Sequence, residues 1–284
     1  MKKSIVFLTM MAVVVMTACE KEIGNESQPT GQKVYSLHFW GDWQYSTMRG
    51  ALADDTQMTD LWIFDFVGDE CLQTIHQTKT DYNWGTPSVS LSYGTHHLYC
   101  VASRGTDPTV NATDKTIVWS KPSDTFWTDY EIEVSSGSNT ACNITMSRVV
   151  TRLRVTVMDE VPADIASLVI TPATWYAGLN YTTGAPAGVL SSVDRSVNVP
   201  SSYVGTTAQL TMSIFGFSSA DEWTTDMTVT AKNAGGGAIG TATIAAAPLR
   251  RNRTTDFSGT LFAGGGALTI LLDGDWLTFY EGTW

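Results

Sequence analysis

Side chains that could catalyse a reaction or bind a metal are scattered along this 284-residue sequence. Neighbouring residues of a strand point to opposite faces, so the adjacent His96 and His97 should not share a metal ion. A glycosidase needs two carboxylates facing each other across a sugar, whereas acid pairs such as Asp54-Asp55 lie in polar stretches typical of solvated loops. We therefore predict a protein that is not an enzyme and has no metal cofactor.

One glycine-rich stretch has the spacing of a dinucleotide-binding turn. Gly235-Gly236-Gly237-Ala238-Ile239-Gly240 satisfies G-x-G-x-x-G. Such a site needs a helix after the glycines, so that the helix N-terminus faces the pyrophosphate. The residues from Thr241 to Ile244 alternate like a strand instead. The stretch predicts a β-hairpin turn, and no nucleotide cofactor is expected.

The thiol with the clearest chemical prediction is Cys19. Lys2 and Lys3 precede an apolar run from Ile5 to Met16, and small residues then lead into Cys19. This order is typical of a secretory signal peptide, and the run is shorter than the about 20 residues that span a bilayer. Its end resembles the bacterial lipobox, which implies that Cys19 is lipidated and becomes the first residue of the mature lipoprotein. An ordinary signal with an incidental cysteine is the alternative.

The remaining cysteines, Cys71, Cys100 and Cys142, have a spacing that fits no zinc or redox motif. Small buried hydrophobic residues are the ordinary interpretation. A disulfide between Cys71 and Cys100 is possible and is left open.

Charge and aromatic content limit the partners that we expect. With 28 acidic against 17 basic residues the formal net charge is −11, which disfavours nucleic acid and anionic lipid as partners. Membrane attachment must then come from the lipid. The ten tryptophans predict core or interdomain packing, with a sugar-stacking platform as the alternative.

Period-two patterns from Val34 onward predict the elements. In the stretch from Arg148 to Met158, Val149, Leu153 and Val155 share one face of a half-buried strand. Strands at short spacing with turn residues between them predict an all-β sandwich architecture. We expect a signal peptide over 1–18, a flexible tether over 19–33, and β-sandwich domains over 34–145 and 146–284.

Four stretches carry a family resemblance. They are the lipobox ending at Cys19, the strand Asp60–Gly68, the strand Met146–Val157 and the late segment Pro248–Phe262. Together they resemble the fimbrillin superfamily of Bacteroidales type V pili, specifically its lipoprotein anchor and accessory branch. The similarity covers most of residues 34–284 and includes no catalytic motif.

This resemblance implies two transthyretin-like β-sandwich domains in tandem and a minor fimbrial subunit at the outer membrane, exposed on the cell surface. In stalk subunits of the family, an arginine-specific protease removes the lipidated segment together with the first strand. A strand from a neighbouring subunit then fills the vacated groove. Anchor subunits keep their lipid and first strand, so the expected partners are other fimbrial subunits and, through the lipid, the membrane.

Arg49 is the residue at which such a cut could occur. It follows the strand Val34–Phe39 in a stretch of small residues, and flexible surface segments are preferred cleavage sites. An ordinary solvent-facing arginine is the favoured interpretation, because an empty groove would expose apolar and backbone polar surface. We expect a mature chain that begins at Cys19 and retains Arg49. The alternatives are a stalk or tip subunit cut after Arg49, or a surface lipoprotein that binds glycans through its aromatic residues.

Overall fold

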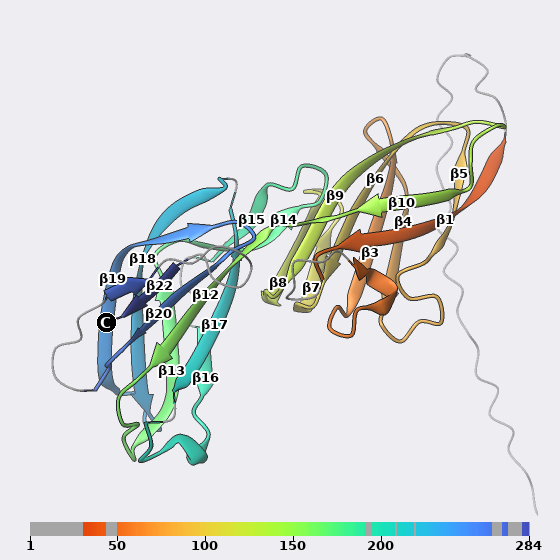
Figure 1. The fold of residues 1–284 in the computed structure, drawn as a ribbon. Coiled ribbons are helices and arrows are strands. Elements are labelled where there is room, and N and C mark those ends of the chain that lie inside the picture. The colour runs from red at the N-terminus through yellow and green to blue at the C-terminus, as the bar shows by residue number, and fades with distance from the viewer. Residues whose placement is uncertain are drawn as a thin grey trace, which may run out of the picture.

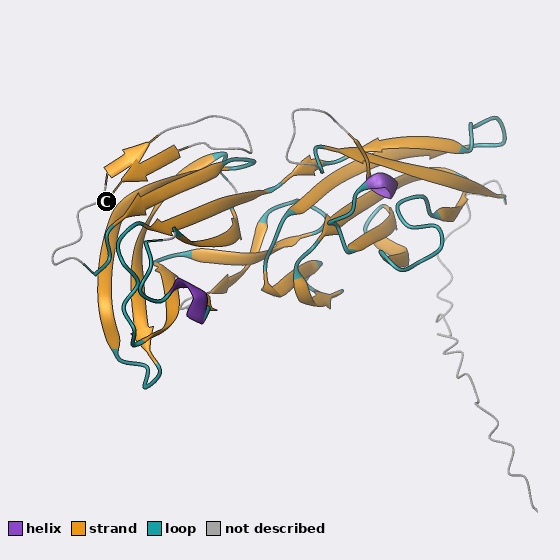
Figure 2. Ribbon diagram, turned by 60° about the horizontal axis from the view of Figure 1, so that its bottom comes forward, coloured by secondary structure: helices purple, strands orange, loops and turns teal. Residues whose placement is uncertain are grey.

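The computed structural model describes residues 31–43, 50–190, 195–207, 209–218, 220–262, 269–271 and 280–283. These residues form strands in stacked sheets, and their only helices are the short 3-10 turns η1 (Leu52–Asp54) and η2 (Ser201–Tyr203) (Figure 2). The predicted all-β fold is confirmed. Within these residues no helix is long and apolar enough to cross a membrane.

Two sheets face each other in what we call the N-terminal body (Figure 1). One sheet contains β1 (Gln32–Gly41), β2 (Gly50–Ala51), β5 (Ser88–Ser92) and β10 (Ala141–Thr145). The other has the order β11 (Ser147–Arg148), β9 (Thr125–Val134), β6 (Gly94–Ser103), β3 (Asp60–Val67) and β4 (Glu70–Thr78). Alternation along β3 places Leu61 and Ile63 in the core between the two sheets.

Two further sheets form the C-terminal body. One has the order β17 (Leu210–Phe217), β12 (Val150–Val157), β20 (Thr254–Gly259), β21 (Thr269–Leu271) and β22 (Tyr280–Thr283). The other has the order β16 (Arg195–Asn198), β13 (Ile165–Pro172), β18 (Glu222–Asn233) and β19 (Ala238–Arg250). Leu153 and Val155 are buried as predicted, and the glycine-rich stretch forms the hairpin turn between β18 and β19.

A fifth sheet joins the two bodies. Its order is β15 (Pro186–Leu190), β14 (Trp175–Asn180), β8 (Thr116–Lys121) and β7 (Thr106–Asn111), so it combines strands from both sides of residue 145. Gly178 on β14 permits the close approach, because a Cβ there would lie 2.1 Å from the carbonyl oxygen of Ile117. The bodies are therefore connected by backbone pairing as well as by the chain.

Candidate functional site: the first strand and the Arg148 cluster

Strand β1 lies in the interior of its sheet. On one side it runs parallel to β10, with Ser36 to Trp40 opposite Ala141 to Thr145. On the other side its first half pairs with β5 and its last two residues with β2, both antiparallel. Each backbone edge of β1 is thus paired over part of its length, Ser36–Trp40 on one side and Gln32–Ser36 with Trp40–Gly41 on the other, so the strand is an interior one and not an edge strand.

The side chains of β1 explain why it occupies this position. Tyr35, Leu37 and Phe39 are at most 1% exposed, while the alternate residues face outward. Burial of one large apolar side chain contributes about 1.5–3 kcal/mol, so these three are a large part of the N-terminal core. Removing β1 would open a groove between β10 and β5 and would expose the core beneath it.

The residues that follow β1 pack against the rest of the N-terminal body. The Trp43 indole N–H donates to the Gly50 carbonyl at 2.8 Å, and its ring centroid lies 4.3 Å from that of Phe126. Gly41 pairs with Gly50, so the two ends of the intervening segment meet. Arg49, the candidate cleavage residue, lies outside the described residues, as does Cys19, the predicted site of lipidation.

Arg148 is a buried cation next to the end of β1. We call Arg148, together with Asp42, Asp124, Phe126 and Asn252, the Arg148 cluster. Arg148 Nε and Nη2 donate to the two Asp124 carboxylate oxygens at 2.6 and 3.0 Å. Its Nη1 donates to Asp42 Oδ2 and to Asn252 Oδ1, each at 3.0 Å, and Nη2 also donates to the Asp42 carbonyl at 2.8 Å. The guanidinium carbon lies 4.5 Å from the Phe126 ring centroid.

This cluster joins segments that are far apart in the sequence. Asp42 follows β1, Asp124 precedes β9, and Asn252 lies in the turn between β19 and β20 of the C-terminal body. Burial raises the pKa of the Asp124 carboxyl, while the Arg148 guanidinium acts in the opposite direction. A buried charge pair of this kind holds its surroundings in one arrangement, because either partner alone would be costly to bury.

The histidines and cysteines occupy separate environments. His96 is buried with Nδ1 2.6 Å from Asp65 Oδ1, whereas the partly exposed His97 has Nδ1 2.9 Å from Asp129 Oδ1. The two adjacent histidines point to opposite faces, as predicted. All three cysteines that the structure describes are free, with Cys71 exposed and both others buried.

Most of the described tryptophans pack inside the molecule. Those that are buried are Trp43, Trp62, Trp84, Trp119 and Trp175. Trp127 donates its indole N–H to the Tyr181 carbonyl across the junction of the bodies at 2.7 Å. Trp40, in contrast, is exposed. The arrangement favours core and junction packing, the first of the two interpretations of the tryptophan content.

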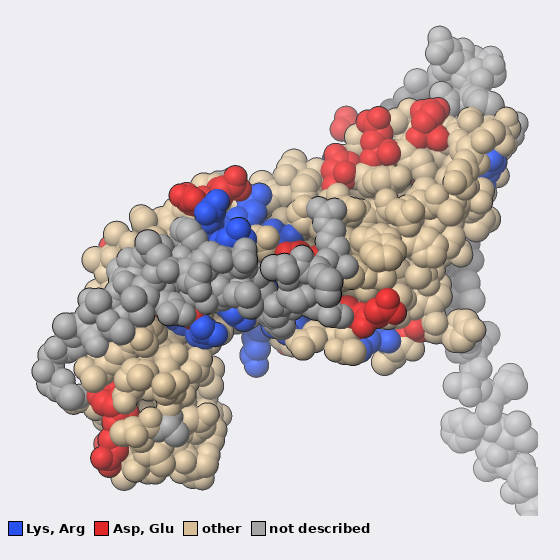
Figure 3. Space-filling model, viewed as in Figure 1, with Lys and Arg blue, Asp and Glu red and all other residues tan. Residues whose placement is uncertain are grey.

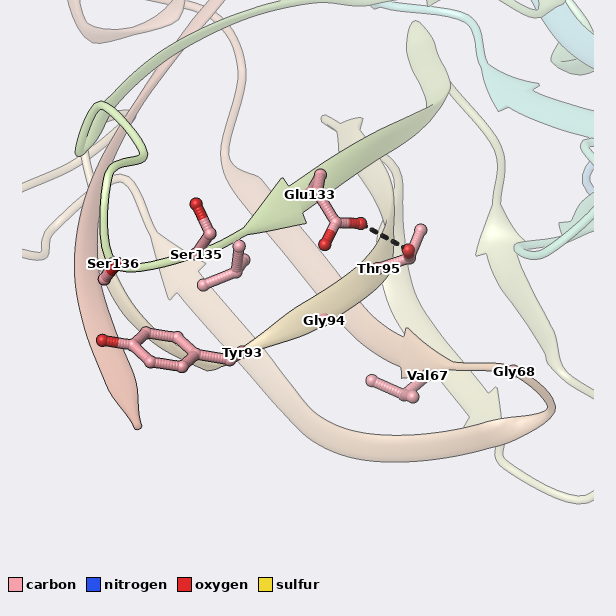
Figure 4. A pocket seen from close by; sticks show the side chains of 9 residues that line it. Val67, Gly68, Tyr93, Gly94, Thr95, Glu133, Ser135 and Ser136 are labelled. Atoms are coloured by element: carbon pink, nitrogen blue, oxygen red, sulfur yellow. Dashed lines mark hydrogen bonds between the residues drawn. The ribbon is translucent and has the colours of Figure 1, made fainter. Parts of the chain in front are cut away.

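A pocket opens at the far end of the N-terminal body, between the turn after β3 and the start of β6 (Figure 4). Thr95 Oγ1 donates to Glu133 Oε2 there at 2.6 Å, and Tyr93 lies at the rim. Glu133 is the one carboxylate among the lining residues, so the pocket offers no acid–base pair. Within the described part of the chain, no three His, Cys, Asp or Glu side chains are placed to hold a metal.

Comparison with known proteins places the chain among sequence and structural relatives. A family model described as "Family of unknown function (DUF6562)" matches residues 93–280, about two thirds of the chain. No curated protein matches the sequence.

Several solved structures are similar to this chain at low sequence identity. A candidate cell adhesion protein from Bacteroides ovatus has a TM-score of 0.54 at 13% identity, over 87% of this chain and 99% of its own. A fimbrial assembly protein from Parabacteroides distasonis has a TM-score of 0.43 at 10% identity, over 83% and 93% of the two chains. The fimbrial anchor protein Mfa2 from Porphyromonas gingivalis has a TM-score of 0.43 at 10% identity, over 76% and 84%. The match to the Bacteroides ovatus protein shows a shared fold, in agreement with the all-β sandwich architecture that the sequence predicted.

Proposed function

The chain belongs to DUF6562, a family of unknown function, and we propose that it is a non-enzymatic fimbrial subunit anchored by lipid at the outer membrane. In this proposal it is an anchor or accessory component that stays at the cell surface and keeps its first strand. Its partners are other fimbrial subunits, which it contacts by strand complementation, and the membrane, which it reaches through lipid on Cys19.

The observation that carries the proposal is the position of β1. Each edge of this strand is paired over part of its length, its inward side chains are buried, and Asp42 just beyond it accepts a hydrogen bond from Arg148. A strand held in this way supports an anchor that retains it. The fold shared with an adhesion protein and the lipobox-like end at Cys19 support the same role.

The decisive experiment is mass spectrometry of the protein purified from its native membrane. We expect one continuous chain that begins at lipidated Cys19 and includes Arg49. A dominant N-terminus at Gly50 without lipid would overturn the anchor assignment in favour of a polymerising subunit.

Lipid attachment has its own test, with a palmitate analogue as a metabolic label. The Cys19→Ala variant should carry no label, because the acyl chains of a lipoprotein depend on that residue. A Cys71→Ala variant is the matched control and should be labelled like the natural protein. Equal labelling of the Cys19→Ala variant would contradict lipid anchoring at this site.

A further inference from the structure

A second groove lies where the two bodies meet, away from β1. It is bounded on one side by the turn between β8 and β9 and on the other by β16 and β17. We call it the β17 groove. Its lining residues include Arg104, Lys121, Ser123, Val197, Met212, Ser213 and Ile214.

The groove follows the edges of two sheets. Among the described strands, β17 pairs with β12 alone and β16 with β13 alone, so each is the last strand of its sheet. Because both edge strands line the same groove, one open side of the C-terminal sandwich lies between β16 and β17. Edge strands present unpaired backbone groups, and extended peptides bind such edges by adding a strand.

The direction of the β17 backbone groups follows from the ladder. Arg152 on β12 donates its N–H to the Arg253 carbonyl on the β20 side, so Phe215, opposite Arg152, directs its N–H and C=O away from β12. The Trp175 indole accordingly donates to the Phe215 carbonyl at 2.8 Å. By the two-residue period, Ser213 and Thr211 direct their backbone groups to the same outer edge.

The floor and walls of the groove have different characters. Met212 and Ile214 belong to the C-terminal core and form an apolar floor, while Val197 on β16 is 41% exposed. Hydroxyl groups from serines of both bodies surround this floor. An extended segment could therefore place alternate side chains against an apolar surface and against polar groups.

The charge of the groove is opposite to that of the whole protein. Its charged lining residues are the cations Arg104 and Lys121, and no carboxylate lines it, although the chain has a net charge of −11. Arg104 Nε donates to Ser123 Oγ at 3.1 Å and Nη1 donates to Gln57 Oε1 at 2.5 Å, and the Arg104 charge also acts to lower the pKa of the nearby buried Asp124 carboxyl. Figure 3 shows basic side chains near the middle of the molecule, with acidic side chains beside them and on both bodies.

We propose that the β17 groove is a docking site for an extended acidic segment of a partner protein. The segment adds to the outer edge of β17 through backbone hydrogen bonds at Thr211 and Ser213. Its carboxylates lie against Arg104 and Lys121, which form charge-assisted hydrogen bonds with them. This inference is independent of the lipid anchor and of the fate of β1, because the groove lies on other strands.

The test uses a fluorescent eight-residue peptide in which valine alternates with glutamate, with binding measured by fluorescence anisotropy on the full chain. We expect saturable binding that weakens as salt is added. The Arg104→Gln/Lys121→Gln double variant should bind at least about tenfold more weakly, as expected for lost charged hydrogen bonds. The Lys33→Gln variant removes a cation at the far end of the N-terminal body, where Lys33 donates to the Ser138 carbonyl, and should bind like the natural protein.

Two further measurements distinguish the contribution of backbone pairing at β17 from the contribution of the charged side chains. A peptide with glutamine in place of glutamate should bind as weakly as the glutamate peptide binds the double variant. The Ser213→Pro variant, which removes an outward N–H from an edge strand, should abolish binding without a change in far-UV circular dichroism. Equal binding by the double variant, or no binding of the glutamate peptide, would overturn the proposal. Self-association of the protein through β17 would also overturn it. That outcome would appear as a natural protein that binds no peptide and whose sedimentation coefficient differs from that of the Ser213→Pro variant.

Discussion

Arg148 shows how one residue can have a role that its sequence neighbourhood conceals. In a strict period-two pattern, Arg148 shares the outward face with Arg152 and Arg154. The chain instead passes from β11 in one sheet to β12 in another at Val149, and Arg148 turns into the interior. Sequence periodicity could not predict this change, because it depends on which strands lie beside each sheet.

Replacing Arg148 by methionine should strongly destabilise the protein. The substitution leaves the Asp124 carboxylate buried without its cation, which costs about 3–5 kcal/mol. Urea unfolding followed by tryptophan fluorescence measures this loss. The Arg250→Gln variant is the control, because Arg250 pairs with Glu222 at 3.2 Å where both side chains are at least 43% exposed. Such a pair contributes up to about 1 kcal/mol, and equal losses for the two variants would contradict a special role for Arg148.

Cysteine reactivity should differ sharply between positions. Burial raises the pKa of the Cys100 and Cys142 thiols, whereas Cys71 is exposed. Because the thiolate is the reactive form, a maleimide reagent at pH 8 should modify Cys71 and leave Cys100 and Cys142 unmodified. Peptide mapping by mass spectrometry gives the outcome, and the same reaction in denaturant should modify all three. Recovery of a Cys71–Cys100 disulfide would contradict this arrangement.

At the scale of elements, the strands were largely predictable and their partners were not. Alternation in the stretches that became β1, β3 and β12 indicated both the strands and their buried faces. The parallel pairing of β1 with β10 joins residues about a hundred positions apart, and no local pattern encodes it. For the same reason the sequence predicted two separate sandwiches but not the sheet in which β14 pairs with β8.

The contribution of β1 to the stability of the core can be measured by shortening one of its buried side chains. Phe39→Ala removes a fully buried ring from between the sheets and should lower the free energy of unfolding by about 3–5 kcal/mol. Val34→Ala on the same strand is the matched control, because Val34 is exposed, and it should change stability by less than about 0.5 kcal/mol. A small effect of Phe39→Ala in urea unfolding would mean that β1 is not part of the stable core.

At the scale of the whole molecule, the two bodies share a hydrophobic cluster. Its members come from both sides of the junction, and the Trp119 ring stacks on Phe217 with centroids 5.6 Å apart. Phe64 and Tyr181 stack similarly at 3.8 Å. With the shared sheet and the Arg148 cluster, these contacts make the junction part of the folded core.

Thermal unfolding should therefore occur as a single calorimetric transition. Trp119→Ala removes a buried ring from the shared cluster and should destabilise the protein by about 3–5 kcal/mol. Because the loss falls on the junction, we expect the transition to broaden or separate into two. Tyr82→Ala, at an exposed loop position, is the control and should leave the profile unchanged. Two transitions in the unaltered protein would show that the bodies unfold independently.

The orientation of β1 has a mechanical consequence. Figure 1 shows β1 running from the far end of the N-terminal body toward the C-terminal body, with the chain entering the fold at that far end. A pull between the N-terminal segment and the C-terminal body would therefore act along the strand. Its hydrogen bonds to β10 and β5 lie across the direction of force and would have to yield together. The first strand is thus loaded in shear, the direction in which a paired strand resists extraction most strongly.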